Sequence, residues 1–450
     1  MNDSLAINER SDAMNRHQTL FAFLIAVLSV ALFVFGHVKG SNMLLYAGTL
    51  QMAVSFCFFS DELLCLELLY IPLAGILKFS PDGAALFSYI SLVGVAVFLM
   101  KRKFLICHSL FICLCSLFAL FILKELVQSF GLAMNYIRLL LIMFAAAVFL
   151  MTSIDDEKPD MEEMRKANLF LTAGVLIASV VGYFYMDNAR LSLFFSTTDH
   201  YYVGEEMVNR FCGVSADPNY YSSLVIFAVA SNLYQYLYRP HIYHIGLIAA
   251  LIFFGILSLS KMFFLLLLVI LLLFVFAWTR KRNSSNKKSA ATLMITVVAL
   301  AACWYFIQNS EAVQVIIMRM GKGSVDRLTT GRFDTWIGYI DSLSTNVEYF
   351  LLGSSSNAAI VGVHKTHNTI LQILWKFGLT GTLCVFSWFV IVYRKCRASK
   401  VTGSLFLFVG CFGATLALDM LFFEQFYWFF VFYLLCRQAA YNERCAADEV

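Results

Sequence analysis

The sequence predicts an all-α polytopic integral membrane protein with about 12–14 transmembrane helices and a large extracytoplasmic loop containing a short amphipathic helix. Three observations lead to this prediction. Of the 450 residues, 60% are hydrophobic and 14% charged, with a mean hydropathy of +0.75. Basic residues gather in short connectors between apolar runs, and one polar loop, at 309–366, is far longer than the rest. This composition excludes a soluble domain built around one large core.

Apolar runs of about 17–25 residues are candidate spans, because about 20 helical residues cross about 30 Å of hydrocarbon. With fourteen such spans, both termini lie in the cytoplasm. The polar segment 1–18 carries no cleavable signal pattern. The predicted spans are 19–37, 42–59, 63–79, 83–100, 104–123, 131–151, 167–186, 218–238, 242–259, 262–279, 291–308, 367–393, 403–418 and 420–437.

Short basic connectors set the expected orientation. Lys/Arg-rich short loops stay in the cytoplasm, and such loops lie at 101–103, 280–288 and 394–400. The loops at 187–217 and 309–366 then both face outward. A loop as long as 309–366 is usually functional or disordered, and its Gly, Trp, Arg and His residues favour function.

These spans divide the chain into regions. We expect a cytoplasmic tail (1–18), an N-terminal transmembrane bundle (19–186), a transmembrane region with both outer loops (187–400), and a C-terminal transmembrane hairpin with a cytoplasmic tail (401–450).

Charge and cysteine usage exclude some partners. The net charge of +4 resides mainly in short connectors, so no nucleic-acid partner is expected. Most of the twelve cysteines lie in apolar runs, and Cys212 alone falls clearly in an outer loop. We interpret them as small hydrophobic residues without a disulfide.

The segment 210–219 starts the eighth span. Asp217 suits an N-cap and Pro218 the first helical position. Arg210 then lies just outside the span, at the depth of lipid headgroups. It either binds a phosphate there or extends to headgroups as an ordinary interfacial arginine.

A short helix is expected after Gly331. Phe333, Trp336, Ile337 and Ile340 recur at helical spacing and form one apolar face. Trp336 is a typical membrane-interface residue, and Arg327 and Arg332 lie at the start of the helix. The alternative interpretation is an interfacial helix with ordinary basic flanks.

The segment His364-Lys-Thr-His-Asn368 opens the twelfth span. If Thr366 caps this helix, His367 falls in its first turn, where the helix dipole disfavours imidazolium. A neutral imidazole near arginines suits a general base beside a phosphate site. Otherwise, His367 is a capping or interface residue. His364 is the weaker candidate, and His-x-x-His alone does not indicate a metal site.

Lys261 lies in the tight turn between the ninth and tenth spans. It either binds substrate or anchors the span end at the interface.

These motifs together resemble a known family. Arg332 with Trp336 four residues later, Leu352-Gly353, His367-Asn368 and Gly378-Leu-Thr-Gly381 are similar to the Wzy_C motif of the O-antigen ligase and Wzy-type polysaccharide polymerase superfamily. The segments 210–219 and 258–261 are also similar to it, although Lys261 stands where the family more often has Arg. The resemblance covers about residues 205–395.

The resemblance implies a metal-independent and cofactor-free glycosyltransferase in the inner membrane of a bacterium, with 187–400 as its catalytic region. Its substrate would be an undecaprenyl-diphosphate-linked oligosaccharide at the outer face, and a flippase and a chain-length regulator would be its partners. His367 would be the base. The diphosphate would be bound by Arg210, Arg332, Arg327 and Lys261, and the acceptor path would include His364, Asn368 and Trp336.

Three activities remain open at this point. A polymerase joins repeat units into O-antigen, capsular or exopolysaccharide, whereas an O-antigen ligase transfers the finished glycan to lipid A-core. The motifs do not separate the two, and we favour the polymerase because that group is larger and more diverse. A transporter of lipid-linked oligosaccharide is the non-enzyme alternative. It fits less well, because transporters place ionisable groups at mid-membrane and here the distinctive polar residues gather at one face.

Overall fold

The computed structural model describes residues 2–81, 83, 85–102, 107–128, 134–156, 158–195, 200–203, 206–281, 332–354, 366–396, 398 and 401–448. The predicted span at 291–308 and most of loop 309–366 lie outside these residues. Two candidate site residues, Arg327 and His364, lie outside them as well.

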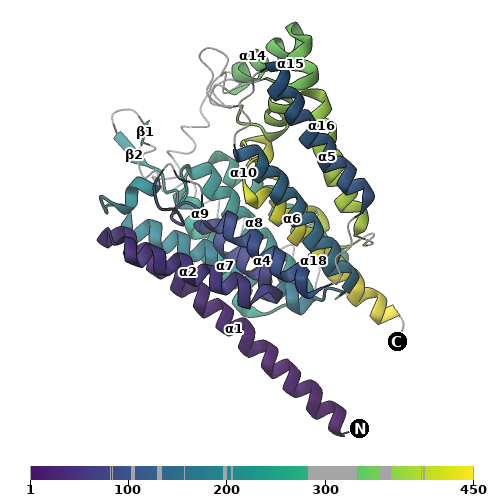
Figure 1. Cartoon of the computed structure of the whole chain (residues 1–450). Coiled ribbons are helices and arrows are strands. Elements are labelled where there is room, and N and C mark those ends of the chain that lie inside the picture. The colour runs from purple at the N-terminus through teal and green to yellow at the C-terminus, as the bar shows by residue number, and fades with distance from the viewer. Residues whose placement is uncertain are drawn as a thin grey trace.

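The described part of the chain is a bundle of helices (Figure 1). Its helices are α1 (Asn2–Lys39), α2 (Asn42–Phe58), α3 (Leu63–Tyr70), α4 (Phe87–Lys101), α5 (His108–Gln128), α6 (Met134–Asp156), α7 (Met161–Tyr185), α8 (Pro218–Tyr238), α9 (Ile242–Leu257), α10 (Lys261–Lys281), α14 (Arg332–Thr345), α15 (Val347–Leu352), α16 (Thr369–Lys395), α17 (Ser404–Phe412) and α18 (Glu424–Asp448). Four short 3-10 helices are η1 (Ser60–Glu62), η2 (Ile71–Leu73), η3 (Leu191–Phe194) and η4 (Gly413–Leu416). An antiparallel hairpin of β1 (His200–Val203) and β2 (Glu206–Asn209) departs from the all-α prediction.

Six of the described helices are long and apolar enough to cross a membrane. The chain is therefore a multi-pass membrane protein by length and composition, while the total of 12–14 spans stays a prediction. The six are His17–Lys39, His108–Val127, Met134–Asp156, Met161–Tyr185, Lys261–Lys281 and Thr369–Lys395.

The centre of the bundle is α8, which is buried along nearly its whole length. It packs against α7, α9, α10 and α17, and Phe227 stacks on Phe429 of α18 with ring centroids 4.1 Å apart. Because Asp217 caps the start of α8, the buried position of this helix places its N-terminal end among the other elements of the candidate site.

The prediction of one continuous helical span at 63–79 is wrong. The helix α3 ends at Tyr70, and η2 with Pro72 at its start follows. Proline lacks the N–H that a continuing helix requires. Beyond it, Gly75 meets the segment before α8 so closely that a Cβ would lie 1.7 Å from the Val214 carbonyl oxygen. The non-helical backbone is thus sheltered by protein, as a membrane interior demands.

A second break interrupts α16. Gly378 has φ +61° within this helix, and Gly353, after α15, has φ +82°. A Cβ on either glycine would lie within 2.6 Å of the other's backbone nitrogen. The side chain of the buried Lys124 on α5 donates to the carbonyl oxygens of Ser354 (2.9 Å) and Lys376 (2.5 Å). This contact fixes α15 against α16.

We expect Gly378→Ala to destabilise the fold by several kcal/mol, because a left-handed backbone at a non-glycine residue costs about 1–3 kcal/mol and the new Cβ would clash with backbone. The midpoint of thermal unfolding in detergent measures the loss. Gly246→Ala is the matched control, since its Cβ would meet nothing within 4 Å. Equal midpoints for the two variants would contradict this account of the break.

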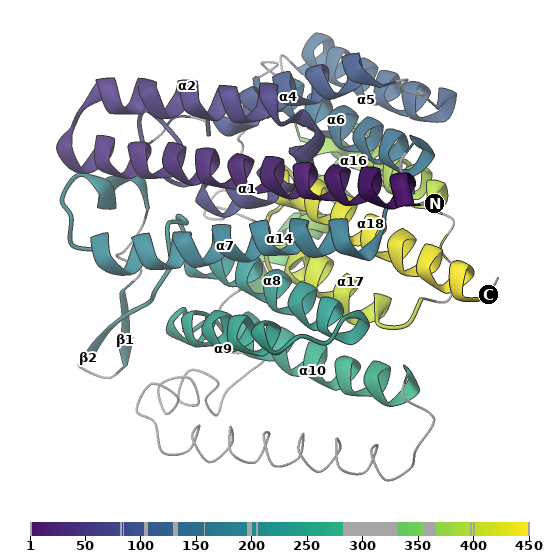
Figure 2. The ribbon, with the colours of Figure 1, turned by 90° about the horizontal axis from the view of Figure 1, so that it is seen from below.

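The bundle has two chemically different ends. The helices α4, α10 and α16 end in basic residues, and Figure 2 shows both termini at one end with the hairpin at the other. At the basic end, the Lys281 side chain donates a hydrogen bond to the Leu237 carbonyl oxygen (3.0 Å), and the Arg437 side chain donates one to the Ala398 carbonyl oxygen (2.8 Å). The candidate site residues lie at the opposite end, which we name the cavity end.

The expected orientation puts the cavity end outside the cell. Ser80 is exposed at the cavity end and Asp156 at the basic end. We therefore expect an impermeant maleimide to label Ser80→Cys in intact spheroplasts, and Asp156→Cys only after permeabilisation. Both variants are made in a chain without the exposed Cys115. The reverse pattern would place the site in the cytoplasm.

Candidate functional site

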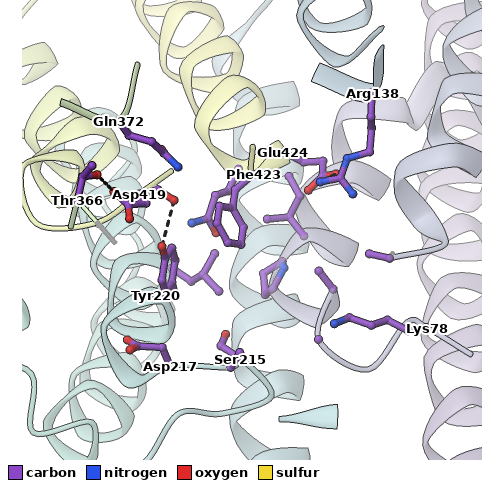
Figure 3. Close-up of a pocket in the computed structure, with 18 of the residues that line it drawn as sticks. Lys78, Arg138, Ser215, Asp217, Tyr220, Thr366, Gln372, Asp419, Phe423 and Glu424 are labelled. Atoms are coloured by element: carbon purple, nitrogen blue, oxygen red, sulfur yellow. Dashed lines mark hydrogen bonds and ion pairs between the residues drawn. The ribbon is translucent and has the colours of Figure 1, made fainter. Parts of the chain in front are cut away.

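The cavity end holds a cavity of about 710 Å³. Its walls come from the loop after α3, from α6, the start of α8, α14, the start of α16 and the segment 419–425. Charged and aromatic side chains share these walls: Lys78, Arg138, Asp217, Lys376, Asp419 and Glu424, with Tyr220, Tyr339, Trp375 and Phe423. In Figure 3, Asp419, Thr366 and Tyr220 lie together, across the cavity from Arg138 and Glu424.

The segment 210–219 forms the cap that the sequence predicts. The Asp217 carboxylate accepts a hydrogen bond of 2.6 Å from the Asn219 N–H, and Pro218 is the first helical residue. An aspartate at this position satisfies one of the unpaired N–H groups of the helix. Ser215 and Asp217 line the cavity as a consequence.

Arg210 is not the surface arginine that we expected. Its side chain is buried, with the residue only 8% exposed. The Nε–H donates to the Ser258 carbonyl oxygen (3.2 Å) and Nη2 to the Asn219 amide oxygen (3.2 Å). The same amide oxygen accepts from the Ser260 hydroxyl (2.8 Å). Arg210 therefore fastens the start of α8 to the turn between α9 and α10.

Lys261 lies where the sequence predicts a tight turn, since α9 ends at Leu257 and α10 begins at Lys261. Leu259 within this turn has φ +49°. Both Arg210 and Lys261 thus belong to one cluster at the turn, beside α8. Neither belongs to the described lining of the cavity.

Arg332 is the first residue of α14 and reaches toward the cavity wall. Its Nη1 donates to the Ala417 carbonyl oxygen (3.0 Å). Burial lowers the pKa of the guanidinium, while the nearby carboxylates of Asp217 and Asp419 oppose that effect. Since an arginine stays protonated in proteins, Arg332 is a partly buried fixed cation beside the cavity.

The helix α14 has two faces. Phe333, Ile337 and Ile340 are exposed, whereas Tyr339 is buried against Trp375 with ring centroids 4.9 Å apart. Trp336, expected at the membrane interface, turns partly inward, and its Nε1–H donates to the Thr366 carbonyl oxygen (2.8 Å).

The prediction that Thr366 caps the twelfth span is wrong. Asn368 is the N-cap, and its side chain accepts from the Leu371 N–H at 3.0 Å. The Thr366 hydroxyl instead binds the Asp419 carboxylate. His367 consequently lies before the cap, half-buried, with φ +49°. A left-handed backbone at a non-glycine residue is uncommon and persists only where its surroundings impose it.

Asp419 has no predicted role, because it stands alone between the predicted spans 403–418 and 420–437. The structure makes the non-helical stretch at 417–421 a meeting point of four elements: α8, α14, α16 and the turn at 366–368. The Tyr220 hydroxyl donates to the Asp419 carbonyl oxygen (3.0 Å), as Figure 3 shows. A single acidic residue between two apolar runs was the available signal.

Arg138 and Glu424 lie within the predicted spans 131–151 and 420–437 and have no predicted role. They are ion-paired across 3.5 Å, and the Ser88 hydroxyl donates to the Glu424 carboxylate (2.5 Å). Both residues line the cavity. The pairing explains how two charges are tolerated in this apolar bundle.

The structure thus brings most candidate residues to one end of the molecule. Trp336, Asn368 and His367 lie around Thr366 and Asp419. Arg332 is hydrogen-bonded to the stretch 417–421. Arg210 and Lys261 form the neighbouring cluster, and the adjacent α8 residues Asn219 and Tyr220 connect the two clusters. Tyr220, Thr366 and Asp419 line the cavity, with His367 next in sequence to Thr366. The candidate residues that the structure describes lie around the cavity and are not among its lining residues: Arg210, Lys261, Arg332, Trp336, His367 and Asn368.

Comparison with known proteins adds no assignment. No protein-family model matches the chain, and no curated protein matches it significantly. Within the described residues, no cluster of three or more His, Cys, Asp or Glu side chains is arranged to hold a metal ion.

Proposed function

We propose that the protein is a glycosyltransferase that polymerises undecaprenyl-diphosphate-linked repeat units into O-antigen, capsular or exopolysaccharide. It acts at the outer face of the cytoplasmic membrane of a bacterium. One observation carries the proposal: three separate sequence blocks, at 210–219, 332–345 and 366–376, contribute residues to the wall of one cavity. These are the blocks in which the resemblance to the polymerase and ligase superfamily resides.

The chemistry of the cavity walls supports a glycan substrate. The rings of Tyr220, Trp375 and Phe423 offer apolar faces against which the C–H groups of a sugar can pack. The amides of Gln372 and Gln425 supply both donors and acceptors for sugar hydroxyls. A pocket with apolar walls and a few polar groups is typical of small-molecule sites.

The proposed reaction needs a base and a stabilised leaving group. The acceptor hydroxyl attacks the anomeric carbon of the donor sugar, forming the new C–O bond. The bond from that carbon to the lipid diphosphate breaks, and the diphosphate leaves with the electron pair. His367 takes the hydroxyl proton. Arg332 stabilises the charge that develops on the diphosphate, because a guanidinium binds phosphate oxygens through two parallel N–H bonds.

A transporter of lipid-linked oligosaccharide is the second candidate function. The buried Arg138–Glu424 pair favours it, since ionisable residues inside membranes often mark a transport path. The pair lies in the wall of the same cavity as Asp419. Both functions would therefore use the same cavity. A polymerase would join the lipid-linked units there, whereas a transporter would only move them across the membrane.

Deletion of the gene in its host separates the functions. A polymerase deletion leaves surface glycan of a single repeat unit. A ligase deletion leaves long lipid-linked glycan that never reaches lipid A-core. A transporter deletion traps single lipid-linked units inside, out of reach of an added glycosidase. Polymer of normal length in the deletion strain would overturn the proposal.

A further inference from the structure

The backbone of the stretch 417–421 binds side chains of two helices of the candidate site, α14 and α16. The Ala417 carbonyl accepts from Arg332 (3.0 Å) and the Leu418 carbonyl from the Thr369 hydroxyl (2.6 Å). The Leu421 N–H donates to the Gln372 side chain (3.1 Å). These contacts place one polar side chain, that of Asp419, between the start of α8 and the turn before α16.

The Asp419 carboxylate clamps that turn from both sides of His367. Its Oδ1 accepts from the Thr366 hydroxyl and from the Asn368 N–H, the latter at 3.2 Å. The Thr366 hydroxyl also lies 3.1 Å from the Asn368 carbonyl oxygen. Asp419 thus binds the residue before and the residue after His367, whose backbone is left-handed.

Several charged and titratable groups face Asp419. Arg332 and Tyr339 approach it from α14, Lys376 from α16, and Tyr220 from α8. Asp217, at the cap of α8, lies close to the same Arg332 and Tyr220. The carboxylate is only slightly exposed, the residue being 7% accessible, so these charges act on it with little screening by water.

We propose that Asp419 is a positioning residue for the transfer reaction: its carboxylate holds the turn at 366–368, and with it the left-handed backbone of His367. The inference rests on the proposed function for its role in the reaction. The geometric part stands on the hydrogen bonds alone. It gives the otherwise unexplained left-handed histidine a physical cause and a use.

Two consequences separate this role from a general effect on folding. Asparagine at position 419 keeps an Oδ1 acceptor for Thr366 and Asn368 but removes the charge. If the clamp is what matters, Asp419→Asn should therefore keep most of the turnover. Alanine at the same position removes the acceptor, so Asp419→Ala should lose turnover while the fold and the donor affinity survive.

The experiment measures the imidazole and the activity separately. The ¹³C-labelled C2–H signal of His367 is recorded at one pH in detergent-solubilised wild type, Asp419→Asn and Asp419→Ala, and assigned by its absence in His367→Gln. Donor affinity and the rate of polymer formation from the lipid-linked repeat unit are then measured on the same preparations. We expect the signal of Asp419→Asn to stay close to that of wild type and the signal of Asp419→Ala to move or broaden, with donor affinity unchanged in both. Asp419→Ala should lose about as much turnover as His367→Ala.

Asp341→Asn is the matched control, because Asp341 is an exposed carboxylate of α14 away from the cavity. It should change neither the His367 signal nor the turnover. An unchanged His367 signal in folded Asp419→Ala would overturn the inference, whatever the activity. A changed signal in Asp419→Ala, with a wild type that makes no polymer, would leave the geometry intact and reject the proposed function instead.

Discussion

Arg332→Ala is expected to abolish polymer formation while leaving the protein folded in the membrane. Arg332 is a partly buried cation beside the cavity, and its one described hydrogen bond goes to the Ala417 carbonyl. Removing a preorganised donor from a developing anion costs about 10²–10³ in turnover. Chain length on a gel of surface glycan, and turnover of the purified protein with lipid-linked repeat unit, measure the effect.

Lysine at position 332 distinguishes charge from geometry. It keeps the positive charge but cannot form two parallel hydrogen bonds to a phosphate, so Arg332→Lys should recover only part of the activity. Arg239→Ala is the control. Arg239 is a half-exposed arginine at the basic end that pairs with Glu443 at 2.6 Å, and such pairs contribute at most about 1 kcal/mol. Normal chain length in a well-expressed Arg332→Ala variant would place the leaving-group site elsewhere.

Local chemistry made some parts of this site predictable. Asp217 and Pro218 start α8 because a side-chain acceptor and a missing N–H are both favourable there, whatever the tertiary context. The helix after Gly331 and the tight turn before Lys261 likewise follow from spacing and from short-range breaks. The structure has both.

Other parts depend on contacts that spacing does not encode. The sequence predicts Arg210 as a surface arginine, whereas in the structure Asn219 and the Ser258 carbonyl enclose its side chain. Thr366 and Asn368 are both competent caps, and Asp419, more than fifty residues later, decides between them by taking the Thr366 hydroxyl. Tertiary contacts decide between such alternatives, because several local arrangements of the chain are nearly equal in free energy.

The candidate site is organised differently in the structure from what the sequence predicts. The sequence points to arginines and a histidine as independent parts of one outer surface. In the structure, Trp336 is hydrogen-bonded to Thr366. Arg332 and the turn at 366–368 are hydrogen-bonded to the stretch 417–421. Binding groups held by such second contacts stay in place when substrate arrives, which is what preorganised catalysis requires.

His367→Ala is expected to give a folded protein that binds the lipid-linked donor and turns it over slowly. A positioned general base contributes about 10²–10⁴-fold, whereas the arginines supply most of the donor binding. The histidine acts only when neutral. Activity of the wild type should therefore fall on the acid side, as the imidazole takes up a proton.

Donor affinity and turnover, measured on the same purified His367→Ala preparation, test the two roles separately. His108→Ala is the control, since His108 is an exposed histidine at the start of α5, at the basic end. It should match wild type in both measurements. Should His367→Ala lose donor affinity while the bound fraction reacts at the normal rate, His367 would be a phosphate ligand. The acid limb would then belong to donor binding, and the proton acceptor would have to be sought among the carboxylates that line the cavity, with Asp419 the nearest in contact with the turn.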